Sequence, residues 1–351
     1  MKQGEKILAI VLIIVIIALG IIFAIKIISE SKQEPNKVVN EPINNEKQEN
    51  KEQEEAKKEK TVEVYKGKDR PIAVMIDNSK EAWPQAGLQD AYLVYEIIVE
   101  GGETRLMAMF KGVDVDKIGP VRSARHYFLD YVMEHDAIYA HFGQSPQAAL
   151  DLKKYKIKDI NGMSEDGTTF KRVRDKYAPH NAVTSTDKII KSAENKKYET
   201  TSDRASVLNY VTDEVTLNGK EAENVYIPHS DLQDVKYVYN KEKKLYTRYA
   251  RDMVQKDWDT KKTITTKNII VQFCNNYTLV DSENKGRQGL YNIGTFDGYY
   301  ITNGKAEKIK ITKNARSSKS VYKDLEGNII DVNDGNTFIN ICPKDTKVVI
   351  K

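Results

Sequence analysis

A run of nineteen uncharged, mostly aliphatic residues near the N-terminus constrains this chain more than any other feature. The run spans residues 7–25 and reads ILAIVLIIVIIALGIIFAI. At about 1.5 Å per residue, a helix of this length crosses the roughly 30 Å hydrocarbon core of a bilayer. The competing interpretation is a cleaved signal peptide, whose apolar region is usually only about 7–15 residues long and ends at small residues. We therefore predict a transmembrane signal-anchor over residues 1–29.

The flanks of this run predict its orientation. Lys2 and Lys6 precede it and favour a cytoplasmic N-terminus, although Lys26 follows it and weakens the bias. Cys274 is the first cysteine of the chain, so no lipid-modified cysteine is expected beside the apolar run. The sequence thus predicts a single-pass protein of the cell membrane with the bulk of its chain extracytoplasmic.

The next segment, residues 30–60, has almost no large apolar side chains and mixes glutamate with lysine. Such a segment cannot bury enough apolar surface to offset the entropy lost on ordering. We predict a disordered charged linker here, followed by folded domains over residues 61–200 and 201–351.

Charge and cysteine content exclude several classes of function. The chain has 55 Lys and Arg against 51 Asp and Glu, a net charge of +4, so no strong field favours nucleic acid as a partner. Neither of the two cysteines has a second cysteine within four residues, and no two histidines have the spacing of a zinc hydrolase. We expect no bound metal and no cofactor.

Short apolar runs separated by turn residues predict an α+β fold of two mixed α/β domains, the second mostly antiparallel. In the first domain, strands are expected at residues 72–76, 91–100 and 104–110, with Gly101-Gly102 between the last two. In the second, strands are expected at residues 225–227, 235–239, 245–249, 269–273, 299–302, 308–311 and 338–341.

The second domain contains tyrosines and cysteines that each have two interpretations. The tyrosines form either a sugar-stacking surface or half-buried sheet positions, and the second is favoured because alternating tyrosine is common in sheets. They are Tyr237, Tyr239, Tyr246, Tyr249, Tyr291, Tyr299 and Tyr300. Cys274 and Cys342 each follow an apolar strand, and they form either a disulfide or two buried thiols.

A two-residue turn at Gly101-Gly102 would place Arg105 opposite Ile98. Glu96 and Glu100 would then flank Ile98 on the same face of the sheet, so two carboxylates would lie near one guanidinium group. This arrangement predicts either a cross-strand ion pair, which is favoured, or part of a binding site.

Positive side chains crowd the start of a helix predicted over about residues 123–134. Arg122, Arg125 and His126 lie at the end where the helix dipole and the unpaired N–H groups favour negative charge. Such a start requires either carboxylates from elsewhere in the domain or a bound anion. The available carboxylates are those of Asp77, Glu96 and Glu100.

Polar residues beyond this helix supply further candidates. The residues around Ser145, GQSPQ, lack the second glycine of the nucleophile-elbow motif G-x-S-x-G. The position of Ser145 before Pro146 instead favours a helix N-cap. Arg172, His180 and Asn181 lie in turn-like surroundings. The histidines with acid–base potential are His126, His141 and His180. The catalytic candidates are Asp77, Glu100, His126 and His180. The ligand-binding candidates are Arg105, Arg122, Arg125, Glu96, Ser145 and Asn181.

Taken together, several runs resemble the YerB-like family of bacterial cell-envelope proteins. In the first domain these are RPIAVMIDN, VYEIIVEGGETRLMAMF, IGPVRSARHYFLDYV, FGQSPQA and APHNAVTS, in matching order across about residues 65–190. In the second domain, TKNIIVQF, KGRQGLYNIGTFDGYYITNGKAEKIKITK and YKDLEGNIIDVNDGNTFINICP match more loosely, because relatives tend to carry tryptophan in place of Thr312 and Phe338. The resemblance implies a surface protein with two α+β domains and no established reaction. Relatives often use a lipidated cysteine where this chain has an apolar helix.

Three hypotheses of function follow, in order of preference. The first is a binding module that holds an anionic envelope group, such as a wall-polymer phosphate or a peptidoglycan carboxylate, at Arg122 and Arg125. The second is a scaffold that docks envelope proteins on the tyrosine-rich domain. The third is a hydrolase or transferase that uses one of the candidate carboxylates as base and a candidate histidine as acid.

Overall fold

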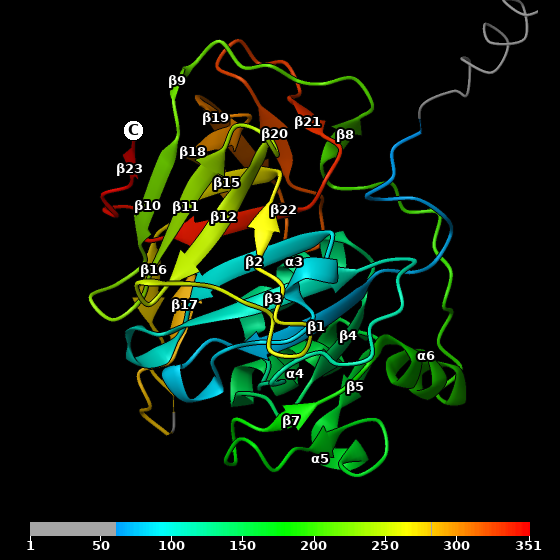
Figure 1. Ribbon diagram of the computed structural model, residues 1–351. Helices are drawn as coiled ribbons and strands as arrows, with labels where there is room; N and C mark the ends of the chain where they lie inside the picture. The colour runs from blue at the N-terminus through cyan, green and yellow to red at the C-terminus, as the bar shows by residue number, and fades with distance from the viewer. Residues whose placement is uncertain (1–60, 282) are drawn as a thin grey trace, which may run out of the picture. The chain divides into compact units, whose positions relative to one another are not determined.

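The largest element of the computed structural model, which describes residues 61–281 and 283–351, is an eleven-stranded mixed sheet (Figure 1). Its strands follow the order β20 (Val321–Lys323), β19 (Lys305–Lys313), β18 (Gly294–Thr302), β15 (Asn268–Phe273), β22 (Thr337–Cys342), β2 (Leu93–Ile98), β3 (Thr104–Phe110), β1 (Ile72–Asp77), β4 (Ile138–His141) and β5 (Asp159–Asn161), with β9 (Lys220–Glu221) on β19. The mixed sheet and the small share of helix agree with the predicted α+β class.

The predicted signal-anchor, residues 1–29, and the predicted linker, residues 30–60, lie outside the described residues. Within residues 61–281 and 283–351, no helix is long and apolar enough to cross a bilayer.

The central sheet joins strands from both ends of the sequence. β2 pairs in parallel with β22, and the register runs from Leu93 opposite Thr337 to Ile97 opposite Ile341. β1 pairs antiparallel with β3 and parallel with β4, and all six of its residues are buried. This continuous burial is expected of a strand that is covered on both faces. The regions before and after residue 200 therefore share one sheet.

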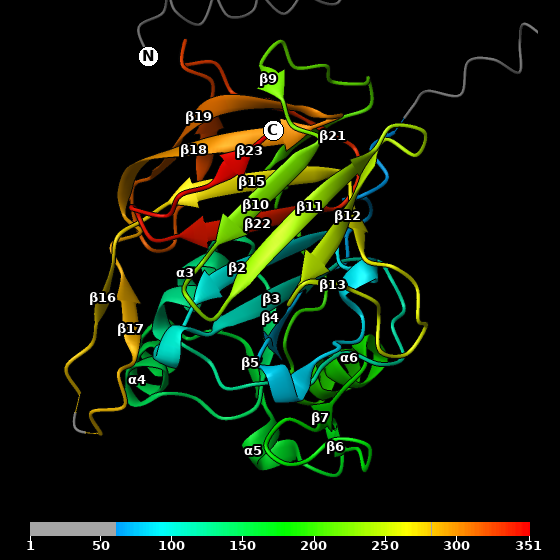
Figure 2. The same cartoon turned by 60° about the vertical axis from the view of Figure 1, so that its left-hand side comes forward.

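A second, six-stranded antiparallel sheet covers part of one face of the first, and Figure 2 shows β10, β11 and β12 lying across it. Its strands are β13 (Met253–Val254), β12 (Leu245–Ala250), β11 (Asp234–Asn240), β10 (Asn224–Pro228) and β23 (Val349–Ile350), with β14 (Thr265–Thr266) on β12. Burial alternates along β12, so Tyr246, Arg248 and Ala250 face inward. An arginine at an inward position requires a buried partner.

The helices are short, and the remaining strands form three two-stranded sheets. The helices are α3 (Leu129–Glu134), α4 (Pro146–Lys154), α5 (Gly162–Glu165) and α6 (Thr186–Asn195), with 3-10 turns η1 (Lys80–Ala82), η2 (Leu88–Asp90), η3 (Glu100–Gly102) and η4 (His126–Phe128). The small sheets pair β16 (Asn276–Thr278) with β17 (Gln288–Leu290), β8 (Asn209–Val211) with β21 (Asp331–Asn333), and β6 (Lys171–Arg172) with β7 (Ala182–Val183). Ser145 caps α4 as predicted, because its Oγ accepts a hydrogen bond from the Ala148 N–H at 3.3 Å.

Two hydrophobic clusters lie on opposite faces of the central sheet. Alternate residues of β1 show the division, since Met75 belongs to the cluster that includes α3 and α4 and Val74 to the cluster that includes the second sheet. Cys274 belongs to the first cluster and Cys342 to the second, and both are buried free thiols. Of the two alternatives for these cysteines, buried thiols are therefore the correct one.

The strands predicted for the second domain are all present, and most of its tyrosines are sheet residues as favoured. Tyr237, Tyr246 and Tyr300 are at most 1% exposed, whereas Tyr291 is 62% exposed. The other three tyrosines named above are half-buried. The seven tyrosines therefore do not form one exposed aromatic surface.

The predicted two-residue turn between β2 and β3 is wrong. Ile98 pairs with Thr104 and Ile97 with Arg105, so the connection consists of residues 99–103. Gly101 and Gly102 both have positive φ, 72° and 77°, and a 3-10 turn lengthens the loop. The register consequently differs by one residue, which moves Arg105 to the face opposite that of Glu96.

Candidate functional site

The central sheet splits at the carboxyl ends of β1 and β4. The two strands pair only over Ile72–Val74, and an extended segment, residues 121–124, then fills the gap between them. The N–H of Arg122 donates to Met75 O at 2.8 Å, and the carbonyl of Arg122 accepts from Phe142 N–H at 2.9 Å. The carboxyl ends of parallel strands are where open α/β sheets place their ligands.

This split corrects the predicted helix start. Arg125 is extended, with φ −122° and ψ 142°, and helical structure begins only at His126 with the 3-10 turn η4. Arg122 and Arg125 therefore belong to the segment that separates β1 from β4. Their orientation comes from carboxylates on neighbouring elements, which was one of the two alternatives for this cluster.

A cavity of about 400 Å³, here called the strand-end cavity, opens at the split. Its walls come from the 121–124 segment, from the turn after β4, from α5 and from the loop before β7. The lining residues are Val121, Arg122, Ser123, Phe142, Gly143, Gln144, Met163, Arg172 and Pro179. The cavity therefore has two guanidinium groups and no carboxylate among its lining residues.

Arg122 forms an ion pair with Asp77, the last residue of β1. Its Nε lies 3.0 Å from Asp77 Oδ2, and the Nδ1 of His180 lies 2.8 Å from the same oxygen. Burial raises the pKa of Asp77, but the hydrogen bond from His180 and the charge of Arg122 outweigh this effect and lower it. Asp77 is thus a buried anion that positions one arginine and one histidine.

Arg172 approaches the cavity from β6. Its Nε lies 2.9 Å from Asp166 Oδ2, its Nη1 donates to Asn181 Oδ1 at 2.9 Å, and its guanidinium lies 4.5 Å from the centroid of the Phe142 ring. An arginine that stacks on a ring and donates to two different side chains is fixed in orientation while it keeps further N–H donors. Asn181, a predicted ligand-binding residue, positions this arginine.

Arg105 and Arg125 are buried beside the strand-end cavity and hold the 121–124 segment in place. Both are 6% exposed and both pair with Glu100, to which Arg125 donates through Nε at 2.9 Å and through Nη2. Both also donate to the carbonyl of Ser123, beside the cavity. Burial and the neighbouring charge of Arg125 lower the pKa of Arg105 to about 10.

Positive charge is in excess in this region. Three guanidinium groups face two carboxylates there, and the exposed fraction of the Arg122 side chain, 26%, gives solvent access to this charge. The three cations are Arg105, Arg122 and Arg125, and the two anions are Asp77 and Glu100. An added anion would compensate the excess.

Glu100 makes stability depend on pH. Burial raises its pKa, but the hydrogen bond from Arg125 and the charges of Arg105 and Arg125 lower it to about 2. Because this pKa is depressed in the folded state, the contribution is fully present above about pH 4.5 and is lost as pH falls toward about 2. We expect Glu100→Gln to lower the free energy of unfolding near neutral pH, and the difference from wild type to shrink in denaturant titrations between about pH 5 and about pH 3. The exposed Glu242→Gln is the control, and a Glu100→Gln deficit that is constant with pH would contradict this prediction.

Of the candidate residues only Arg122 lines the cavity, and four others neither line it nor pair with the carboxylates that hold Arg122 and Arg172. Glu96 is fully buried on the opposite face and pairs with Arg248 at 2.5 Å. Ser145 is the N-cap of α4 and is 2% exposed. His126 lies near Arg316, and burial together with that charge lowers its pKa to about 4. His141 contacts Gly143 O through Nδ1 and Asp159 Oδ2 through Nε2, so both ring nitrogens are occupied.

The arrangement does not build an activated serine or cysteine. Ser79 Oγ and Asp77 Oδ2 both approach the Nδ1 of His180, whereas a catalytic triad needs the serine on the other ring nitrogen. Cys342 lies 3.8 Å from His229, but it is fully enclosed and burial raises its pKa well above the usual range. Among the residues that the structure describes, no cluster of three metal-ligating side chains occurs.

Comparison with known protein families identifies the family to which this chain belongs. Residues 58–199 match the family described as protein of unknown function (DUF3048) N-terminal domain, and residues 225–339 match the corresponding C-terminal domain. The chain belongs to this family, the YerB-like proteins, which confirms the resemblance in its sequence.

The relatives include one protein known from both sequence and structure. Putative lipoprotein YerB of Bacillus subtilis (strain 168) is 31% identical over 285 residues, which are 78% of this chain and 81% of the relative. A crystal structure of YerB protein from Bacillus subtilis matches with a TM-score of 0.72 at 30% identity, and covers 80% of this chain and 94% of that one. The fold described above is therefore shared with this relative.

Proposed function

We propose that this chain is an extracytoplasmic protein of the cell envelope that binds an anionic group in the strand-end cavity. The observation that carries the proposal is the presence of Arg122 and Arg172 on one cavity whose nine lining residues include no acid. Each guanidinium is held by a carboxylate, that of Asp77 or Asp166, so its remaining donors are already oriented. The planar guanidinium group matches phosphate and carboxylate ligands.

The proposed location rests on the sequence and on the relative. The apolar run at residues 7–25 predicts a membrane anchor, and the Bacillus subtilis relative carries the name of a lipoprotein. This chain has no cysteine before Cys274, so we propose that a helix replaces the lipid as anchor. Phosphate groups of wall polymers and carboxylates of peptidoglycan are envelope ligands of suitable chemistry.

Anion binding should depend on the two cavity arginines. With the full chain in a non-ionic detergent, we expect inorganic phosphate or acetate to raise the Tm of the wild type. A variant carrying both Arg122→Gln and Arg172→Gln should bind at least about tenfold more weakly, because each lost charged hydrogen bond is worth roughly 1.5–3 kcal/mol. The readout is the anion concentration that gives half of the maximal Tm shift.

Arg174→Gln is the matched control, since Arg174 is an exposed arginine just after β6 and does not line the cavity. It should respond to the anions as the wild type does. Equal stabilisation of the wild type and the double variant would disprove the site, as would the absence of any shift in the wild type.

A further inference from the structure

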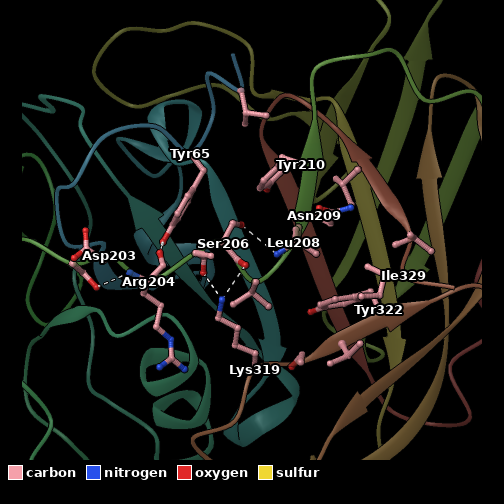
Figure 3. A pocket seen from close by; sticks show the side chains of 18 of the residues that line it. Tyr65, Asp203, Arg204, Ser206, Leu208, Asn209, Tyr210, Lys319, Tyr322 and Ile329 are labelled. Carbon is pink, nitrogen blue, oxygen red and sulfur yellow. Dashed lines mark hydrogen bonds between the residues drawn. The ribbon is translucent and has the colours of Figure 1, made fainter. Parts of the chain in front are cut away.

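A second cavity among the described residues lies apart from the strand-end cavity and shares no lining residue with it. It measures about 700 Å³ and is formed by residues 62–68, residues 202–210, the region of β20 and residues 329–332. Figure 3 shows Tyr65, Tyr210, Tyr322 and Lys319 around the same space. Its volume lies within the range of about 300–1,000 Å³ that is typical of small-molecule sites.

The walls of this cavity, here called the tyrosine pocket, are mainly apolar. Tyr210, Tyr322, Leu208 and Val332 are each less than 10% exposed and form its base, and Ile329, which is 60% exposed, lies at its rim. The hydroxyl of Tyr210 contacts Thr337 Oγ1 at 3.0 Å, so this polar end is already satisfied. The hydroxyl of Tyr65 likewise donates to the carbonyl of Arg204 at 2.9 Å. Aromatic and aliphatic carbon therefore remains for a ligand.

A positive charge lies at the edge of this apolar surface. Lys319 Nζ donates to Ala205 O at 2.6 Å and to Ser206 O at 3.3 Å, which are neutral groups. An ammonium has three N–H donors, so one donor remains after these two bonds. Arg204 adds a second positive charge nearby, and its Nε donates to a third neutral group, the carbonyl of Glu134, at 3.0 Å.

The acidic groups around the tyrosine pocket have other cationic partners. Glu134 lies 2.7 Å from Lys313, and Asp136 lies 2.5 Å from Arg70. Asp203 is the one acidic residue among those that line the pocket, and its side chain is 90% exposed, 3.8 Å from Lys68. Lys319 therefore forms no ion pair with an acid of the described residues, although the buried carboxylate of Glu134 offsets part of its charge. Burial and the charge of Arg204 lower the pKa of Lys319, and the charge of Glu134 opposes this shift without reversing it.

We propose that the tyrosine pocket binds an amphiphilic anion, in which a phosphate or carboxylate head contacts Lys319 and an alkyl chain lies on the tyrosine rings and Ile329. The apolar base favours a hydrocarbon tail, because burial of apolar surface is worth about 25 cal/mol per Å². The Lys319 ammonium, which has no ion-pair partner and keeps one N–H donor, favours an anionic head over an uncharged one. This site is independent of the strand-end cavity and of any anion bound there.

Photo-crosslinking of the full chain in lipid vesicles tests the proposal. The probes are dodecyl phosphate, dodecanoate and dodecanol, each with a diazirine in the chain, and labelled peptides are mapped by mass spectrometry. We expect the two anionic probes to label peptides that contain Tyr210 or Ile329 at least about tenfold more than dodecanol does, since about 1.4 kcal/mol separates tenfold affinities. Comparison of the phosphate and carboxylate probes shows which head group is preferred.

Variants of one lysine separate head-group recognition from tail binding. Lys319→Met should remove the preference for anionic probes, and Lys319→Arg should retain it. Lys323→Met is the matched control, because Lys323 is an exposed lysine at the end of β20, shortly after Lys319 in the chain, and does not line the pocket. Ile329→Glu should weaken labelling without unfolding the protein, because Ile329 is largely exposed.

Three results would overturn the proposal. They are equal labelling by dodecanol and the anionic probes, labelling that Lys319→Met leaves unchanged, and the absence of labelled pocket peptides in the wild type. Competition by unlabelled dodecyl phosphate, but not by inorganic phosphate at the same concentration, would distinguish the tyrosine pocket from the strand-end cavity.

Discussion

Replacing Arg248 by leucine is expected to destabilise the fold by about 3–5 kcal/mol, because the change leaves Glu96 buried without its cation. Arg248 Nη2 lies 2.5 Å from Glu96 Oε2, and both side chains are fully buried. Nη1 of Arg248 also donates to Gln255, and its guanidinium lies 5.3 Å from the Phe338 ring. The pair connects β2 of the central sheet to β12 of the second sheet. Denaturant unfolding of the full chain, followed by circular dichroism, measures the loss.

Two further variants identify the cause of this loss. Replacing both Glu96 and Arg248 by leucine should restore most of the stability, because apolar residues often substitute for a buried ion pair at little cost. Lys310→Ala removes one partner of an exposed pair with Asp297, and should change stability by less than about 1 kcal/mol. If the double variant were as unstable as Arg248→Leu, loss of packing and not the uncompensated charge would explain the effect.

Glu134→Leu is the second change for which we expect a loss of about 3–5 kcal/mol. Oε2 of Glu134 accepts from Lys313 Nζ at 2.7 Å, from Ser320 N–H at 2.9 Å and from Ser320 Oγ at 2.8 Å, while Oε1 accepts from Tyr95 at 2.8 Å. Without this carboxylate, the buried ammonium and the Ser320 N–H lose their acceptor. Amide hydrogen exchange should therefore show faster exchange at Ser320 in addition to lower global stability.

A conservative variant tests whether charge or shape dominates at this position. Glu134→Gln keeps the size and one acceptor oxygen but leaves Lys313 without its anion, so most of the loss should remain. If Glu134→Gln were as stable as the wild type, Lys313 would be satisfied by Ser318 O, which it contacts at 2.5 Å. That result would contradict the proposed role of the ion pair.

Local sequence patterns were sufficient for most strands and for the α4 cap, because these depend on neighbours in the chain. The β2–β3 register could not be predicted, since it depends on a loop in which both glycines have positive φ and not on residue types alone. The start of the helix expected from about residue 123 was also wrong, since residues 121–125 are extended. This segment is extended because it completes hydrogen bonds at the ends of β1 and β4, which are distant in sequence.

The candidate site was predicted in part. Asp77, Arg122 and His180 were named from sequence and come together at the end of β1, where the 121–124 segment and the loop before β7 both reach Asp77. Arg172 was noted but not chosen as a ligand-binding residue, and its role depends on contacts with Asp166 and Phe142 that no spacing rule supplies. Arg248 is a charged residue at an inward-facing position of a strand whose burial alternates. Such a position predicts a buried partner of opposite charge, but it does not identify Glu96 as that partner.

The parallel pairing of Leu93 with Thr337 has a consequence for the order of events during synthesis. β2 emerges long before β22, its neighbour on one side, so the sheet cannot close until β22 has been synthesised. Until then β2 presents an open edge that favours pairing with other chains. Late closure also delays completion of the central sheet, and a chain that crosses a membrane as an extended polypeptide must do so before it folds. The long-range pairing that slows folding is thus compatible with the export that the predicted signal-anchor would direct.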